Sequence, residues 1–134
     1  MQTALAVLKE RVGEIQDLDR TSSLLGWDQQ VKMPPGGGGV RAEQLATVGR
    51  IAHEALTSDD MGRLLDELAP VEETLEYDSD EASLIRLVRR DWDKARRVPA
   101  ELRAEMSRES SGLLLGTAVW EGACAPGKAL EKKF

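Results

Sequence analysis

The sequence predicts an all-α protein with about five helices arranged in antiparallel hairpins. Apolar residues recur at steps of three and four along most of the 134-residue chain. No segment alternates apolar and polar residues with the period of two that marks a strand. Leu and Ala occur together with many Glu, Asp and Arg, a composition typical of helices. The length fits one domain, so we expect residues 1–134 to form a single helical domain.

The first helix is expected over residues 3–30. Its apolar residues recur at helical spacing, and charged residues fill most of the opposite face. The stripe consists of Leu5, Leu8, Val12, Ile15 and Leu18. Hydroxyl side chains weaken the middle of this helix, so we allow for a kink or a break near 20–23. Pro34 disfavours helix at the residue before it, and Pro35 and the glycine run at 36–39 complete the end.

The second and third helices are expected over residues 40–56 and about 59–68. The apolar stripe of the second helix consists of Leu45, Val48, Ala52 and either Ala55 or Leu56. Ser58 suits the N-cap of the third helix, and the two aspartates that follow it suit a positively polarised helix start. Pro70 is expected to come after this helix.

The fourth helix is expected to begin near Asp78 or Ser79, because Asp78 and Glu81 have the spacing of a capping box. Its apolar stripe consists of Leu84, Ile85, Val88, Trp92 and Ala95. It should end before Pro99, which suits the first position of a fifth helix. Glycines beyond residue 110 weaken the later turns of that helix.

Net charge and cysteine content limit the partners and the location. The net charge is −6, and phosphate binding needs a positive surface, so we expect no nucleic-acid partner. The basic run at 86–97 is interpreted as a solvated helix face, with a site for a polyanion or an acidic partner as the alternative. The single cysteine allows no internal disulfide, and charges interrupt the N-terminal segment every few residues. We therefore expect a cytoplasmic protein with no membrane contact.

Three patterns begin like functional motifs and then fail. The glycine run at 36–39 lacks the lysine and hydroxyl of a phosphate loop and fails the dinucleotide pattern, so we interpret it as a loop between helices. His53-Glu54 starts the zinc motif His-Glu-x-x-His, but Thr57 stands at its last position. The chain has no second histidine, which excludes a two-histidine zinc site within one copy. Cys124 has only His53 as a candidate base, on a different predicted helix, and is interpreted as an inert thiol.

The pair Trp27-Asp28 lies just before the predicted chain reversal. We interpret it as a packed corner in which Asp28 accepts hydrogen bonds from the backbone or from an arginine. Lining a groove is the alternative.

An ordered set of motifs surrounds this corner. Leu-Leu-x-Trp-Asp-Gln is followed by Met-Pro-Pro-Gly-Gly, then by Arg-Ala-Glu-Gln-Leu-Ala-Thr, Ala-His-Glu and Leu-Thr-Ser, and later by a basic helix with Val-Pro-x-x-Leu. This set, over roughly residues 1–110, resembles the N-terminal region of the carboxypeptidase Taq family of metallopeptidases. The signature positions, which are also candidates for the wall of a substrate groove, are Trp27, Asp28, Gln29, Met33, Pro34, Pro35, Arg41, Glu43 and Gln44.

The resemblance implies the N-terminal helical portion of a larger helical enzyme. Such enzymes remove single residues from peptide C-termini with a divalent metal, usually zinc. One helix supplies two histidines and a general-base glutamate, and a later helix supplies a glutamate ligand, all downstream of the resembling region. No catalytic and no metal-binding residue is therefore carried over to this chain. Metal and peptide substrate belong to the full-length family, and we expect this chain to hold no cofactor and to be inactive alone.

Residues 111–134 depart from the family's pattern, and ALEKKF at 129–134 resembles a later piece of it. We therefore expect an N-terminal fragment or a degenerate relative of a metallocarboxypeptidase, divergent or truncated over 111–134. The alternative is a small helical interaction module that forms a homo-oligomer, such as a dimer, or binds a full-length homologue. Amphipathic helices separated from their usual partner surface leave apolar patches that favour association.

Overall fold

The computed structural model describes residues 3–109, and this part of the chain is all-α, as the sequence predicts. Four helices are complete within it: α1 (Ala4–Val31), α2 (Gly38–Thr57), α3 (Asp59–Thr74) and α4 (Asp80–Ala95). A short 3-10 helix, η1 (Pro35–Gly37), joins α1 to α2. The described residues thus contain four helices where about five were expected. Helical backbone also covers residues 100–109, and the later part of the expected fifth helix lies outside the described residues.

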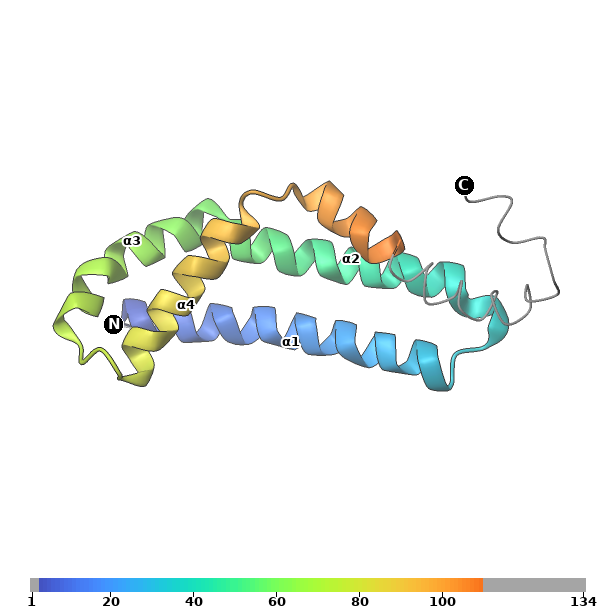
Figure 1. The fold of residues 1–134 in the computed structure, drawn as a ribbon, viewed down its shortest axis with the longest axis horizontal. Coiled ribbons are helices and arrows are strands. Elements are labelled where there is room, and N and C mark those ends of the chain that lie inside the picture. The colour runs from blue at the N-terminus through green and yellow to red at the C-terminus, as the bar shows by residue number, and fades with distance from the viewer. Residues whose placement is uncertain (1–2, 110–134) are drawn as a thin grey trace, which may run out of the picture.

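The helices form an elongated bundle (Figure 1). α1 and α2 run antiparallel as a long hairpin and make the most extensive helix contact in the described part of the chain. α3 and α4 pack at the end of this hairpin where α1 begins, and residues 100–109 return along α2 toward its start. Within residues 3–109, no helix is both long enough and apolar enough to cross a membrane.

α1 continues without interruption through the hydroxyl-rich positions where a kink or a break was allowed for. The Thr21 hydroxyl donates a hydrogen bond to the Asp17 carbonyl at 2.8 Å, and the Ser23 hydroxyl donates to the Asp19 carbonyl at 3.0 Å. Both hydroxyls therefore bind carbonyl oxygens one turn earlier in the same helix, where they do not displace the helical N–H donors.

α3 also extends further than expected, because it continues through Pro70 to Thr74. Proline within a helix removes one backbone hydrogen bond and crowds the carbonyl four residues earlier. The prediction that the helix would end before Pro70 was therefore wrong. Leu68, before the proline, is fully buried, and Leu75, just after the helix, also packs against the core. Burial of one leucine contributes about 1.5–3 kcal/mol, which offsets most of the local cost of the proline.

Serine residues cap the starts of both short helices. The Ser58 hydroxyl accepts a hydrogen bond from the Met61 N–H at 3.2 Å, as expected for the N-cap of α3. At the start of α4 the cap is Ser79, whose hydroxyl accepts from the Ala82 N–H at 3.3 Å. Ser79, and not Asp78, therefore holds the capping position, with acidic residues in the first turn of α4 as the helix dipole favours.

The apolar core lies at one end of the bundle, between α1, α3 and α4. Its buried members are Leu8, Met61, Leu65, Leu68, Ile85 and Val88. α2 instead buries its smallest side chains, and its buried positions are Gly38, Ala42, Ala46 and Ala52. Of the stripe expected for this helix, Ala52 is buried while Leu45 and Val48 are half-buried. Two of these small residues border hollows beside other segments, because Ala52 lines a groove toward α4 and Ala46 lines a hollow beside residues 101–108.

Candidate functional site

The signature residues of α1 and α2 meet through Arg41. Its guanidinium donates to the Leu25 carbonyl at 2.7 Å and forms an ion pair with Asp28 at 2.8 Å. The Arg41 Nε also donates to Gln44 Oε1 at 3.1 Å. Only 15% of the Arg41 side chain is exposed, so these contacts satisfy a charge that is largely withdrawn from water. We call this set of Leu25, Asp28, Arg41 and Gln44 the hairpin clamp, because it ties the end of α1 to the start of α2.

The turn that follows α1 is built from the other signature residues. The backbone N–H of Met33 donates to the Asp28 carbonyl at 2.9 Å, which closes the helix end. Pro34 then adopts extended backbone and Pro35 begins η1. The Met33 Cγ lies so close to Gly37 that a Cβ at this position would come within 3.1 Å of it. A side chain at Gly37 would require Met33 to shift by a few tenths of an ångström, and the run serves as a joint between helices.

Trp27 has a different environment from its neighbour Asp28. Its side chain is 58% exposed, and the large apolar residues Leu24, Val31 and Val40 nearby in the sequence are exposed as well. The sequence interpretation placed Trp27 and Asp28 together in a packed corner. Asp28 does bind an arginine there, but Trp27 points its apolar surface into solvent.

Glu43 joins α2 to the helical residues 100–109. Its two carboxylate oxygens accept from Arg108 at 2.7 and 3.2 Å. The hydrogen bond from Arg108 holds the pKa of Glu43 below its ordinary value, and the same contact raises the pKa of Arg108. Glu43 thus positions a third helical segment beside the hairpin.

A groove of about 640 Å³ opens on the side of the hairpin that faces α4 and residues 98–107. Gln29 is the signature residue that lines it, together with His53 from α2 and Lys94 from α4. Asp28, Arg41 and Gln44 bind one another in the hairpin clamp and are not part of this wall.

His53 has a structural contact at one end of this groove. Its Nε2 donates to the Val98 carbonyl at 2.6 Å, which ties α2 to the segment that follows α4. Thr57, at the last position of the failed zinc motif, donates its hydroxyl to the His53 carbonyl at 2.8 Å. Within residues 3–109, no group of three His, Cys, Asp or Glu side chains is placed to hold a metal. Cys124 lies outside the described residues.

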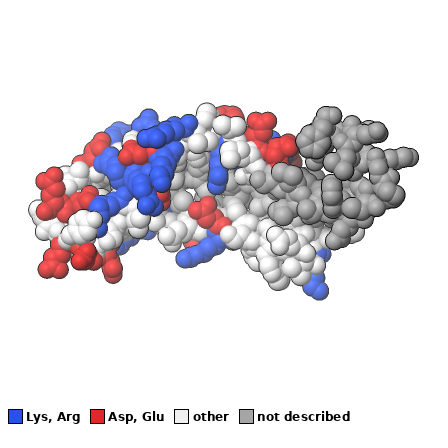
Figure 2. All heavy atoms as spheres, viewed as in Figure 1, with Lys and Arg blue, Asp and Glu red and all other residues white. Residues whose placement is uncertain are grey.

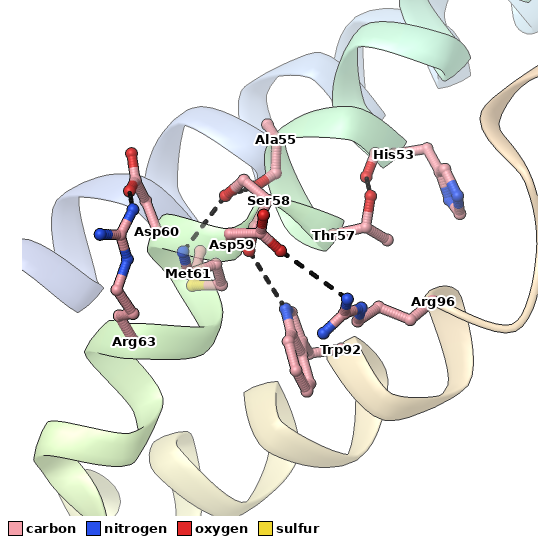
Figure 3. A network of polar contacts seen from close by, with 10 residues as sticks. All are labelled: His53, Ala55, Thr57, Ser58, Asp59, Asp60, Met61, Arg63, Trp92 and Arg96. Atoms are coloured by element: carbon pink, nitrogen blue, oxygen red, sulfur yellow. Dashed lines mark hydrogen bonds and ion pairs between the residues drawn. The ribbon is translucent and has the colours of Figure 1, made fainter.

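Trp92 anchors the junction between α2, α3 and α4 (Figure 3). Its indole N–H donates to the Ser58 carbonyl at 3.4 Å, and the Arg96 guanidinium lies 4.6 Å from the centre of its ring. Arg96 also forms an ion pair with Asp59 at 3.7 Å. The indole lies so close to Gly62 that a Cβ there would come within 2.6 Å of it. Sequence analysis missed this contact. The one signal in the sequence was a glycine inside the short helix α3, where glycine is unfavourable unless space requires it.

The basic run on α4 forms a visible patch over α3 and α4 (Figure 2). Several of its arginines bind acidic side chains. Arg86 pairs with Glu72 at 3.8 Å, and Arg89 pairs with Asp66 at 2.8 Å, both across the α3–α4 contact. These pairs favour the interpretation of the run as a solvated face with internal charge partners.

Comparisons with known proteins add a family relationship. The family model for carboxypeptidase Taq (M32) metallopeptidase matches residues 7–126. The chain is 28% identical over 110 residues to thermostable carboxypeptidase 1 of Thermus thermophilus, covering 82% of this chain and 22% of the relative. It is 31% identical over 108 residues to thermostable carboxypeptidase 1 of Pyrococcus furiosus, covering 81% of this chain and 20% of the relative. The chain therefore spans about a fifth of the length of these curated relatives. No solved structure matches the chain significantly.

Proposed function

Because this chain belongs to the carboxypeptidase Taq (M32) metallopeptidase family, we propose that it forms the N-terminal helical part of a metal-dependent carboxypeptidase and supplies no part of its metal site. The observation that carries this proposal is the use of the signature residues. Asp28, Arg41 and Gln44 hold one hairpin together, and none of them lines the groove beside it. The chain thus acts as a scaffold.

The residues that the structure describes, 3–109, do not fit the metal that the family implies. A divalent metal in such an enzyme would polarise the peptide carbonyl and activate water. Zinc sites of this kind need several nitrogen or carboxylate ligands around one point. His53 is the single histidine of the sequence, and its Nε2 is bound to the Val98 carbonyl.

Peptidase activity of the isolated chain tests this proposal directly. The purified chain is incubated with Zn²⁺ and an N-blocked dipeptide, and release of the C-terminal amino acid is measured. We expect no release above the metal-only control, because residues 3–109 contain no group of side chains placed to hold a metal. Release that depends on metal and disappears with a chelator would contradict the proposal.

Complementation tests the positive half of the proposal. The Thermus thermophilus relative is prepared without the 110-residue stretch that this chain matches, and the chain is added in trans. We expect peptidase activity to rise on addition of the chain. Arg41→Ala should reduce this gain, because the hairpin clamp would be lost, whereas the exposed Arg20→Ala should not. No gain at any concentration would count against the scaffold role.

A second candidate function is a small interaction module located in the cytoplasm. The exposed side chains Leu24, Trp27 and Val31, spaced along one face of α1, favour it, because exposed aromatic and aliphatic residues often anchor interfaces. The partner would be a second copy or a full-length homologue. Light scattering distinguishes the cases: a dimer that Trp27→Ser dissociates supports a homo-oligomer, and a monomer contradicts it.

A further inference from the structure

The groove beside the hairpin has the pattern of a helix-binding surface. α1 contributes five residues at successive steps of four, three, four and three, and these are Ile15, Asp19, Ser22, Gly26 and Gln29. α2 contributes five, and four of these follow at steps of four, three and four, namely Leu45, Gly49, Ala52 and Leu56, with His53 as the fifth. Steps of this kind place side chains along one face of a helix, in the spacing used by helices that pack lengthwise. Two antiparallel helices therefore present matching faces to one groove.

Small residues form the middle of this surface. Ser22 and Gly26 from α1 lie in it together with Gly49 and Ala52 from α2. A Cβ added at Gly26 would meet nothing within 4 Å, so the space next to this glycine is open. On the α1 side, small side chains let a third helix approach closely, whereas on the α2 side Ser107 already lies beside Gly49, where a Cβ would come within 3.2 Å of its hydroxyl oxygen. Apolar side chains provide contact area, with Ile15 and Leu56 at one end of the groove and Leu45 toward the other.

The dimensions fit one helix of about four turns. The α1 face from Ile15 to Gln29 spans fourteen residue steps, or about 21 Å at 1.5 Å per residue. The volume of about 640 Å³ is smaller than a whole helix of this length, so the groove would take one face of the helix and leave the opposite face outside.

Charges on the two sides of the groove differ. Asp19 lies on the α1 side, whereas Lys94 and Arg103 lie on the side formed by α4 and residues 98–107, where Asp91 is also found. A helix with a cationic residue toward α1 and a carboxylate toward Lys94 and Arg103 would match this arrangement.

We propose that this groove binds an amphipathic helix of about four turns that belongs to the catalytic remainder of the metallocarboxypeptidase. The inference rests on the proposed function, and it specifies the surface and the chemistry of the partner. The relatives are about five times as long as the stretch that this chain matches, so most of the family polypeptide is available to supply that helix. The bound helix turns apolar residues toward Leu45 and Leu56 and a carboxylate toward Lys94.

Gly26→Leu tests this inference without removing any contact within the chain. The probe is the Thermus thermophilus relative without its matched 110-residue stretch, confirmed as helical by circular dichroism. The dissociation constant is measured by isothermal titration calorimetry. Overpacking a fitted contact commonly weakens binding by a factor of about 10 to 100. We therefore expect Gly26→Leu to raise the dissociation constant at least about 10-fold. Gly13→Leu is the matched control, because Gly13 is also in α1 with open space around it but does not line the groove.

A charge pair sharpens the test. Lys94→Glu should weaken binding several-fold and change its dependence on salt, whereas Arg97→Glu, which does not line the groove, should leave binding unchanged.

The outcomes separate the inference from the function on which it rests. Equal binding by wild type and Gly26→Leu would overturn the groove while leaving the scaffold role in place. Absence of binding by the wild-type chain to the helical probe would overturn both. A wild-type dimer that Gly26→Leu converts to a monomer would show that a second copy occupies the groove, and this would also overturn the proposal.

Discussion

The two ends of the α1–α2 hairpin are held by different forces. At the end where α1 begins, large apolar side chains such as Leu8, Leu65 and Ile85 are withdrawn from water between three helices. At the other end the buried positions of α2 are small, and the hairpin clamp around Arg41 supplies directional contacts instead. The first end is stabilised by non-directional burial, and the second is fixed in geometry by a few polar bonds.

This difference explains where apolar surface remains exposed. The core end buries Leu8, Leu65 and Ile85, although Tyr77 there is 75% exposed, whereas Leu24, Trp27, Val31 and Val40 at the clamp end are all more than half exposed. An end that is fixed by polar bonds does not need those side chains for its own packing. The core end is therefore stabilised mainly by its own buried side chains, whereas the clamp end leaves apolar surface available for contact.

The largest effect is expected at the core end. Leu65 is fully buried, and Leu65→Ala should lower the free energy of unfolding by about 2–5 kcal/mol, through lost burial and a cavity. Leu24→Ala is the matched control at the clamp end, where the side chain is 62% exposed, and should change stability by less than about 1 kcal/mol. Urea unfolding measures both. Equal losses would erase the contrast between the two ends.

Removal of Arg41 should have the next largest effect. Arg41→Ala breaks the contacts to the Leu25 carbonyl and Asp28, and hydrogen bonds to charged groups contribute about 1.5–3 kcal/mol. Arg20→Ala removes an arginine that is 75% exposed and should have little effect. Amide hydrogen exchange should increase near residues 25–44 in Arg41→Ala. If exchange instead increases mainly around Leu65, Arg41 does not stabilise the clamp end as described.

A smaller loss is expected from Gly62→Ala. The new methyl group would come within 2.6 Å of the Trp92 ring, and the resulting displacement should outweigh the better helix propensity of alanine by about 1 kcal/mol. Gly13→Ala, with open space around it, should instead stabilise the chain by about 0.5–1 kcal/mol. If Trp92 packs as described, thermal unfolding gives a lower melting temperature for Gly62→Ala and a higher one for Gly13→Ala. Stabilisation by both substitutions would rule out that contact.

Periodicity in the sequence predicted the fold class and most helix starts. The serine before α3 and the proline-glycine run after α1 are local signals, and the structure uses both. The end of α3 was mispredicted, because the burial of Leu68 and Leu75 on both sides of Pro70 is a tertiary effect that no local rule contains. Residues 20–23 were treated as weak for a similar reason, since the bonds that their hydroxyls make depend on the helix being formed.

The candidate site was less accessible from sequence. The sequence interpretation left open whether Asp28 would accept hydrogen bonds from the backbone or from an arginine, and the choice of Arg41 depends on the register of two antiparallel helices. The exposure of Trp27 was not foreseen, because helical spacing does not say which of two neighbouring faces meets a partner. The groove could not be predicted from one helix alone, because residues of both α1 and α2 line it. The spacing of its lining residues can be recognised in each helix only once the pairing of the two helices is known.

Acidification should have the smallest effect on the free energy of unfolding, and it acts on one carboxyl at each end of the hairpin. Glu81 of α4 pairs with Lys9 of α1 at 3.1 Å at the core end, and the hydrogen bond from Lys9 lowers the pKa of Glu81. At the clamp end, the hydrogen bond from Arg108 lowers the pKa of Glu43. A carboxyl with a lowered folded-state pKa contributes stability that is present above its unfolded pKa of about 4.5 and is lost as the pH falls through the folded value.

Stability should therefore decline modestly as the pH is lowered from about 6 to 3, and the two carboxyls should be separable by location. Glu43→Gln at pH 7 should increase hydrogen exchange in residues 103–108, because the bond that holds Arg108 to α2 is weakened. Glu81→Gln should instead affect amides near the α1–α4 contact. Since the core end has large buried side chains besides this ion pair, its exchange should change less than that of residues 103–108. A larger change at Glu81 would mean that the core end, too, relies on its polar contacts.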